Sequence, residues 1–320
     1  MLELLRELTK SVDTIVILGS PNLRFFFKLG LDEGAVIYRG STDECRIVIP
    51  IRVSKDFEKF LPSRCEVVKY SYDSYPLHSY VITKSFSNTL IGVLKSFAKP
   101  GEELGVPLNY VDTPTYLALS KFWRLRDLSK DIRVLRYRKE DTMVRELIEL
   151  HNIIKKIVEM CRSEGLEVER CILVKALDIF NYVGLGLLNR SSNFATLRIT
   201  LDKPPYILNY RWTIALSKKV EDVVKNIGDH VEKVSKNYYS KPCLDLVRNL
   251  KSQLQRQGYR VWVDICGVGT EFCEYPSLSE CLYENVVIDS GAVVQLEVVV
   301  DETIYVPKLI VVRNRDIEVY

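Results

Sequence analysis

The sequence predicts two domains, an α/β domain over residues 1–137 and an α+β domain over residues 138–320. In the first domain, short apolar runs alternate with segments of helical spacing, which is typical of a mixed or parallel sheet covered by helices. The longest amphipathic stretch of the chain follows, in residues 136–165. Two β-rich segments beyond it enclose further helical segments. The second domain is therefore expected to place helices over a curved, mainly antiparallel sheet.

The strands of the first domain are predicted from apolar runs that end in turn residues. "TIVILG" (14–19) is a buried-strand run that "SPN" terminates. The opening segment "MLELLRELTKSVD" has charges among its apolar positions, so it favours a helix over a signal peptide. Further short strands are expected at "FFFKLGL", "GAVIYRG", "CRIVIPI" (45–51) and "LGVPLNY". Helices are expected at "NTLIGVLKSFA" (88–98) and "PTYLALSKFW" (114–123).

The second domain is expected to begin with a long helix in residues 136–165, capped by Asp141 or Thr142 and ending before Gly165. His151 is expected on the charged, exposed side of this helix. The apolar stripe of the helix comprises Met143, Leu147, Leu150, Ile154, Ile157 and Met160. Further helices are predicted over 169–184, 219–237 and 242–257, with a hairpin over 196–216 and several strands over 259–320.

Composition places the chain among ordinary globular proteins. Of its 320 residues, 47% are hydrophobic and 27% charged, and 45 basic against 42 acidic residues give a net charge of +3. This near balance offers no general argument for nucleic-acid binding. No apolar stretch approaches the ~20 residues of a membrane span, so a cytoplasmic location is expected. Richness in Lys, Arg, Glu, Ile and Val is compatible with a thermophilic source.

The eight cysteines are scattered and form no CxxC pair. In a cytosol they are expected to be buried thiols, because disulfides inside cells are mainly a feature of hyperthermophiles. Their positions are 45, 65, 161, 171, 243, 266, 273 and 281.

One segment resembles a catalytic signature. "ICGVGTEFCEYP" (265–276) matches the glycine, glutamate and proline positions of G-H-G-x-G-x-x-x-H-E-x-P. This pattern is typical of the pita-bread metallopeptidases, which include aminopeptidase P, prolidase, methionine aminopeptidase and creatinase. "DSGAVVQLEVV" (289–299) resembles that family's next motif. Similarity at "SPNLRFFFKLGL", "LRYRKEDTMVRELIELHNII" and "VVRNRDIEVY" extends the resemblance over nearly the whole chain, including a creatinase-type N-terminal domain.

The resemblance implies a two-metal site whose ligands are mostly missing. Active members hold two divalent cations on two aspartates, one histidine and two glutamates, and the metals supply a hydroxide nucleophile. In this chain the histidine position is Cys266 and the last glutamate position is Pro307. Glu297 falls on the first metal-binding glutamate. The aspartate pair aligns with Asp202 and Thr213, or, in a second alignment, begins at Asn209.

The histidines that act on the substrate are also missing. Cys273 occupies one of their positions, and the chain has three histidines in all, none at a motif position. The five positions Asp202, Thr213, Cys266, Glu297 and Pro307 are therefore interpreted as vestigial metal-site positions, and Cys273 as a vestigial substrate-histidine position.

Other interpretations of these residues stay open. Asp202, Cys266 and Glu297, with Cys273, could converge on zinc, because thiolate is a good zinc ligand. The favoured interpretation is that each cysteine is a small apolar filler, although a Cys266–Cys273 disulfide is also conceivable. Nucleophilic cysteine catalysis is less favoured, since no histidine lies nearby to act as base.

The resemblance thus implies a pseudoenzyme, a catalytically inactive homologue of Xaa-Pro aminopeptidase and dipeptidase that needs no cofactor. By analogy with metal-free members such as a domain of the FACT histone chaperone, it would bind a peptide or protein, with the ribosome or chromatin as candidate partners. No membrane partner is expected, and a homodimer is weakly favoured. The tyrosine-rich segment 70–80 could form a contact surface. The alternative is an active Xaa-Pro peptidase with a rearranged site that holds zinc, manganese or cobalt.

Overall fold

The computed structural model describes residues 2–27, 33–50, 64–71, 82–83, 85–270 and 273–320. The chain forms two compact units, Met1–Leu135 and Arg136–Tyr320. Most of the tyrosine-rich segment 70–80 lies outside the described residues. Among the described helices, none is both long and apolar enough to cross a membrane.

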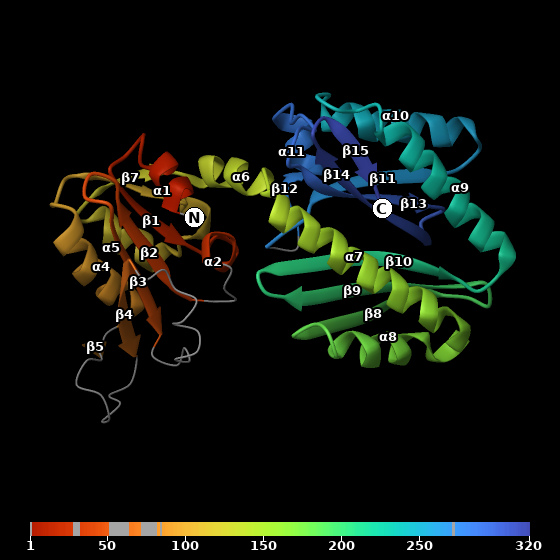
Figure 1. The fold of residues 1–320 in the computed structure, drawn as a ribbon, viewed down its shortest axis with the longest axis horizontal. Helices are drawn as coiled ribbons and strands as arrows, with labels where there is room; N and C mark the ends of the chain where they lie inside the picture. The colour runs from red at the N-terminus through yellow and green to blue at the C-terminus, as the bar shows by residue number, and fades with distance from the viewer. Residues whose placement is uncertain (1, 28–32, 51–63, 72–81, 84, 271–272) are drawn as a thin grey trace. The chain divides into compact units, whose positions relative to one another are not determined.

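The first unit contains a mixed sheet of seven strands in the order β5-β4-β3-β2-β1-β6-β7 (Figure 1). The pairs β1/β2 and β2/β3 are antiparallel, and the remaining neighbours run parallel. The strands are β1 Thr14–Leu18, β2 Ala35–Arg39, β3 Glu44–Pro50, β4 Cys65–Ser71, β5 Ile82–Thr83, β6 Glu103–Val106 and β7 Arg124–Asp127. The helices are α1 Leu2–Leu8, α2 Ser20–Phe27, α4 Phe86–Phe97, η1 Leu108–Tyr110, α5 Thr113–Ser120 and α6 Ser129–Tyr137. The predicted α/β class is confirmed.

The strand predicted at "FFFKLGL" is wrong where the structure describes it. Phe25 and Phe26 belong to helix α2, and both are buried. Pro21 fits the first turn of that helix, where its missing N–H is no loss. A short apolar run by itself does not distinguish a buried helix from a buried strand.

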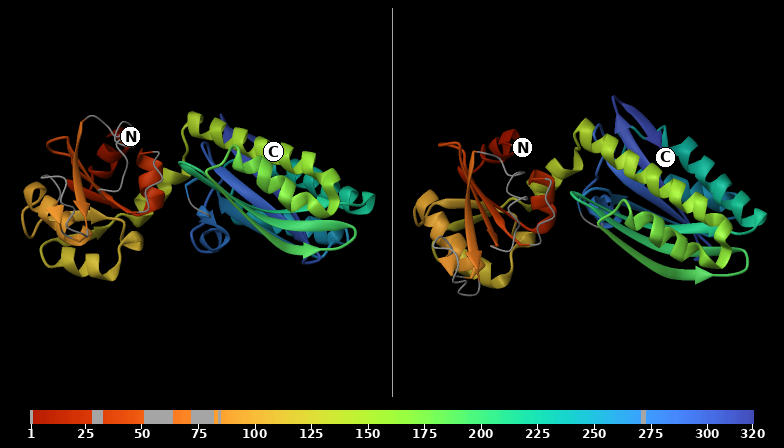
Figure 2. Two further views of the ribbon diagram at one scale, coloured as in Figure 1. Left: turned by 90° about the horizontal axis from the view of Figure 1, so that it is seen from below. Right: turned by 60° about the horizontal axis from the view of Figure 1, so that its bottom comes forward.

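The second unit contains two antiparallel sheets, β10-β9-β8 and β12-β11-β13-β14-β15. Helices α7 and α8 lie on the same side of strands β8–β10 (Figures 1 and 2). The strands are β8 Tyr182–Arg190, β9 Phe194–Lys203, β10 Tyr206–Ala215, β11 Val261–Gly267, β12 Glu274–Ser277, β13 Val293–Val300, β14 Ile304–Arg313 and β15 Asp316–Val319. The helices are α7 Asp141–Cys161, η2 Arg162–Glu167, α8 Val168–Leu177, α9 Lys218–Ser235, α10 Cys243–Arg256 and α11 Leu278–Tyr283. The predicted hairpin and the α+β class are confirmed.

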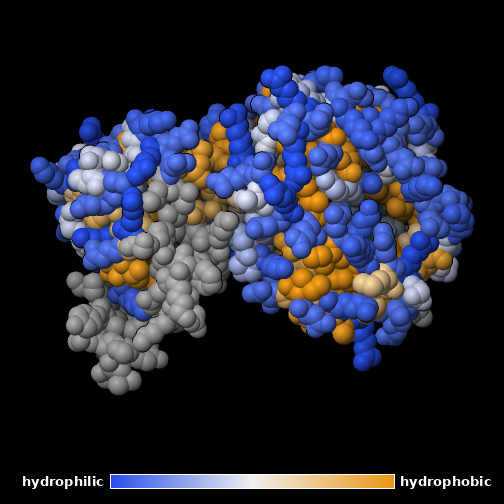
Figure 3. Space-filling model, viewed as in Figure 1, coloured by the Kyte–Doolittle hydropathy of each residue, from blue (hydrophilic) through white to orange (hydrophobic). Residues whose placement is uncertain are grey.

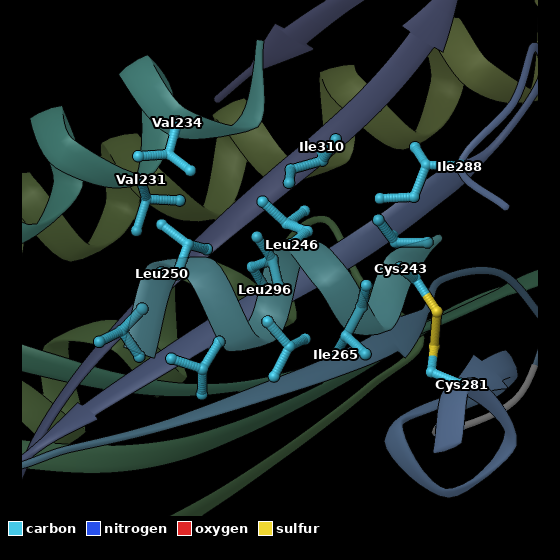
Figure 4. Close-up of a cluster of buried hydrophobic side chains, with 14 of the residues drawn as sticks. Val231, Val234, Cys243, Leu246, Leu250, Ile265, Cys281, Ile288, Leu296 and Ile310 are labelled. Carbon is cyan, nitrogen blue, oxygen red and sulfur yellow. A yellow bond between two sulfur atoms is a disulfide. The ribbon is translucent and has the colours of Figure 1, made fainter. Parts of the chain in front are cut away.

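The core of the second unit lies between helices α9 and α10 and the larger sheet. Leu246 and Leu250 of α10 pack with Leu296 of β13 and Ile310 of β14 (Figure 4). All eight residues of β13 are buried. On the face drawn in Figure 3, hydrophilic side chains cover most of this unit, with apolar groups gathered in patches.

Three local predictions in this unit are wrong. The helix predicted over 169–184 ends at Leu177, and its last residues begin strand β8. The N-cap of α7 is Glu140, whose side chain makes no capping hydrogen bond. His151 is buried rather than exposed, with 1% of its surface accessible. It lies four residues after Leu147 and three before Ile154, so it belongs to the apolar stripe that faces the sheet.

The prediction of free thiols is also wrong, because all eight cysteines are paired. The Cα–Cα distances of 4.5–6.0 Å lie in the usual disulfide range. The sequence indicated only the Cys266–Cys273 pair, as an alternative to buried thiols, and that pair is present. The partners of the other three pairs become neighbours only after strands and helices pack. The pairs are Cys45–Cys65, Cys161–Cys171, Cys243–Cys281 and Cys266–Cys273.

Candidate functional site

Strands from both sheets of the second unit line a cavity of about 500 Å³, here called the sheet cavity. Its wall comes from β8–β11, β13 and β14 and the segment after β11. The polar and charged residues that line it are Arg198, Asn209, Arg211, Asp264, Gln295, Glu297 and Tyr305.

The alternation of side chains along strands β11 and β13 brings three polar residues to the sheet cavity. On β11, Asp264 faces the sheet cavity while its neighbours Val263 and Ile265 belong to the hydrophobic core. On β13, Gln295 and Glu297 alternate in the same way with core residues. The register pairs Asp264 with Glu297, so these two carboxylates are direct cross-strand neighbours. Like charges opposite each other are unfavourable unless a cation joins them.

Arg211 of β10 is that cation. Its Nη2 atom lies 2.6 Å from Oε1 of Glu297 and 3.5 Å from Oδ2 of Asp264. Its guanidinium also lies over the ring of Tyr305, 5.3 Å from the centroid. The sheet cavity therefore holds a compact arrangement of one guanidinium and two carboxylates.

The protonation of Glu297 depends on its burial. Only 4% of its surface is accessible, and this loss of water raises its pKa to about 7, against the opposing effect of Arg211. Near neutral pH, Glu297 is consequently a mixture of carboxylate and carboxylic acid.

Two amides and a second arginine complete the polar wall. Asn209 accepts hydrogen bonds through Oδ1 from Thr200 Oγ1 at 3.2 Å and from Arg198 Nε at 3.4 Å. The side chain of Arg198 is exposed. Gln295 is only 7% accessible, and its amide has no hydrogen-bond partner within the described residues. Because this amide lines the sheet cavity and is not among the fully buried polar atoms without a partner, it is open to a ligand or to water.

Glu274, the glutamate of the family-like motif, is held in a buried ion network. Glu274 accepts from Arg136 at 3.1 Å, from Lys139 at 2.7 Å and from the Thr270 hydroxyl at 2.7 Å. Burial raises the pKa of Glu274, but Lys139 and Arg136 outweigh it and lower that pKa to about 2. A Cβ at Gly269 would overlap this carboxylate, which explains the need for glycine there. In this chain the motif residues Gly269 and Glu274 therefore have a structural role.

The structure brings together three of the predicted site positions. Cys266, Cys273 and Glu297 all line the sheet cavity, with the two cysteines joined as a disulfide. Asp202, near the end of β9, is not among its lining residues, and its backbone carbonyl accepts from the N–H of Asn181.

Thr213 and Pro307 lie apart from the sheet cavity. The hydroxyl of Thr213 bonds to that of Thr196 at 2.7 Å and accepts from the backbone N–H of Tyr305 at 2.8 Å. It thereby ties β10 to β14. Pro307 pairs with Glu297 in the β13/β14 ladder. Tyr275, within the motif, packs against Tyr137 with ring centroids 5.7 Å apart.

Sequence reasoning missed Arg211, Asp264, Gln295 and Arg198. The available signal was period-2 alternation: Asp264 precedes Cys266 by two residues, and Gln295 precedes Glu297 by two. The motif alignment did not mark them because it compares only positions that the signature names.

The two-metal site that the sequence resemblance implies does not fit these residues. The two carboxylates already bind Arg211, and the two cysteines are joined to each other. Within the described parts of the chain, no three histidine, cysteine or acidic residues are grouped closely enough to hold a metal ion. The same observations leave no thiolate for the alternative zinc site.

Comparison with known proteins gives a match at the level of the fold. No family model and no curated protein matches the sequence. The fold is similar to that of an Xaa-Pro dipeptidase from Bacillus anthracis, with a TM-score of 0.74, 17% identity and coverage of 99% of this chain and 96% of the other. An X-Pro aminopeptidase from Thermotoga maritima matches with a TM-score of 0.76, 10% identity and coverage of 100% and 96%. Prolidase from Pyrococcus furiosus matches with a TM-score of 0.67, 17% identity and coverage of 100% and 98%.

These full-length matches confirm the pita-bread fold with its additional N-terminal domain. The structural neighbours are consistently prolidases, Xaa-Pro dipeptidases and aminopeptidases P.

Proposed function

We propose that this protein is a catalytically inactive relative of the Xaa-Pro peptidases, and that it binds a peptide or protein segment in the sheet cavity. The observation that carries the proposal is the position of Arg211, 2.6 Å from Glu297 and 3.5 Å from Asp264.

Arg211 opposes metal-assisted hydrolysis. A divalent cation beside Glu297 would have to displace a guanidinium that already pairs with both carboxylates, and a fixed positive charge repels any cation nearby. Nucleophilic catalysis by a cysteine would need a thiolate with an adjacent base. Cys266 and Cys273 are bonded to each other, and no histidine is among the residues lining the sheet cavity.

The same wall suits recognition of a peptide. The Gln295 amide can donate to a peptide carbonyl and accept from a peptide N–H. The exposed guanidinium of Arg198 can bind a carboxylate, such as a peptide C-terminus or an acidic side chain. The volume of about 500 Å³ is in the usual range for small-ligand sites, so it takes the end of a peptide rather than a folded domain.

Binding and hydrolysis can be measured on the same purified protein. Titration calorimetry with short peptides that begin Ala-Pro, in the presence of chelator, is expected to show binding in the micromolar to millimolar range. Arg198→Ala and Gln295→Ala are expected to weaken binding about tenfold each. Lys219→Ala, an exposed position on α9 outside the sheet cavity, is the matched control.

Hydrolysis of an Ala-Pro peptide with added manganese or cobalt is the opposing test. Turnover by the wild-type chain that Glu297→Gln abolishes would overturn the assignment as inactive and support the alternative of a rearranged metallopeptidase. Failure of all peptides to bind at millimolar concentration would overturn the binding role.

By family analogy the bound segment belongs to a ribosomal or chromatin protein, which cosedimentation with ribosomes or nucleosomes tests. A homodimer is tested by light scattering. Disulfides persist in oxidising compartments and in the cells of hyperthermophiles, so a cytoplasmic location goes together with a thermophilic source.

A further inference from the structure

A second cavity of the second unit lies between helices α7 and α9 and strands β10 and β14. Its volume is about 380 Å³, and it is here called the helix cavity. It shares no lining residue with the sheet cavity. One side is basic, one is aromatic, and the remainder is largely apolar.

The basic side carries lysines from three elements: Lys155 of α7, Lys225 of α9 and Lys308 of β14. Lys308 is partly buried, and burial together with the charge of Lys155 lowers its pKa. Within the described residues, neither Lys155 nor Lys308 has a carboxylate within 4.0 Å. A partly buried ammonium without a close counter-charge is unfavourable, and an anion bound in the cavity would offset this cost.

The acidic residues of the wall do not cancel this charge. Glu221 is bound by Arg162 at 2.9 Å, so that pair is neutral. Asp229 and Glu232 partly offset the charge of Lys308, but neither carboxylate lies within 4.0 Å of its ammonium group, and Glu232 already pairs with Lys236 at 2.7 Å.

A glycine makes room for the lysine on β14. Gly228 lies inside α9, where glycine weakens a helix relative to alanine. A Cβ at this position would lie 3.1 Å from Cε of Lys308. The helix therefore leaves space at the point where the Lys308 stem passes toward the cavity.

The aromatic side is formed by Trp212 and His151. Their rings are stacked, with centroids 6.0 Å apart and planes inclined by 25°. Nδ1 of His151 lies 3.0 Å from the hydroxyl of Tyr210, and burial lowers the pKa of His151 to about 3, so this ring is neutral. Val158, Val224 and Val306 add apolar walls beside the rings.

We propose that the helix cavity binds a small organic anion with an aromatic ring. The carboxylate or phosphate of the ligand lies between Lys155 and Lys308, and its ring lies against Trp212. This proposal does not rest on the peptide site, because the two cavities share no lining residue.

Four probes test it: benzoate, phenyl phosphate, inorganic phosphate and the uncharged benzyl alcohol. Titration calorimetry is expected to show binding of benzoate or phenyl phosphate and weaker binding of the other two, and the stronger of the two aryl anions identifies the acid group. Binding is also expected to change the tryptophan fluorescence of the wild-type protein but not that of Trp212→Phe.

Variants of the two cavity lysines test whether the anion binds in the helix cavity. Lys308→Met and Lys155→Met are each expected to weaken the aryl anion about tenfold, whereas Lys219→Met and Arg198→Ala leave its affinity unchanged. A thermal melt of each variant verifies that it is folded. Unchanged affinity in both cavity-lysine variants, loss of affinity in Arg198→Ala, or equal binding of benzyl alcohol would overturn the proposal.

Discussion

Replacing the buried Glu274 by glutamine should destabilise the second unit more than a conservative change at an exposed ion pair. The carboxylate of Glu274 binds two buried cations, Arg136 at 3.1 Å and Lys139 at 2.7 Å. The side chains of all three are at most 2% accessible. Glutamine keeps the size of the side chain but removes the negative charge that joins the cations.

Two routes give the size of the effect. Breaking a buried ion pair by removal of one partner costs about 3–5 kcal/mol. Independently, the pKa of Glu274 falls from an ordinary 4.5 to about 2, and this difference corresponds to roughly 3 kcal/mol of stability. The two estimates agree, and for a unit of this size the melting temperature should fall by roughly 10 °C.

The same pKa difference fixes the pH dependence. Because the folded-state pKa is lowered, the stabilisation by Glu274 is fully present above pH 4.5 and is lost as the pH falls toward 2. Thermal unfolding of wild-type protein and Glu274→Gln should therefore differ most at neutral pH and converge in acid. Glu302→Gln, at the exposed pair with Arg260, is the control and should melt like the wild type at every pH. A loss of less than about 1 kcal/mol at neutral pH, or a difference that does not change with pH, would refute the reasoning.

Three further outcomes are expected. Because burial raises the pKa of Glu297 to about 7, the stability of the wild-type protein should decline as the pH rises from 4.5 through 7. The denaturant midpoints of Glu297→Gln should decline less over that range. Parallel curves for the two proteins would contradict this. Thr213→Val removes the acceptor of the Tyr305 N–H and should lower the free energy of unfolding in urea by about 1–3 kcal/mol. Thr303→Val is the control and should cost less, because the backbone carbonyl that accepts from Thr196 is kept. Unreduced protein should show no cysteine alkylation by mass spectrometry, and alkylation before reduction would disprove the pairing. Replacing Cys45 and Cys65 by serine opens a loop of 20 residues and should lower the free energy of unfolding by about 3 kcal/mol.

Most of the fold could be predicted from local patterns. The hairpin over 196–216 and the helices near 219–237 and 242–257 follow apolar periodicity closely enough that the structure reproduces them within about two residues. The failures have a shared cause. At "FFFKLGL" and at the end of the segment 169–184, short apolar runs fit helix and strand equally, and tertiary packing decided between them.

The candidate site was predictable only in part. The motif led to Cys266, Cys273 and Glu297, all of which line the sheet cavity. The decisive residue, Arg211, sits in a different sheet, and no sequence pattern relates its position to that of Glu297. Its role became visible only where β10 approaches β11 and β13 and brings the guanidinium to 2.6 Å from the carboxylate.

The sequence by itself determined the fold class, the order of the elements and the glycine positions of the motif, because these follow from periodicity and local backbone geometry along the chain. The pairing of the eight cysteines, the burial of His151 and the placement of Arg211 between two carboxylates came from the packing of distant segments. These outcomes depend on strand register and on the approach of separate sheets. For the strand residues Arg211, Asp264 and Glu297, a register shift of one residue would turn the side chain to the opposite face of its sheet.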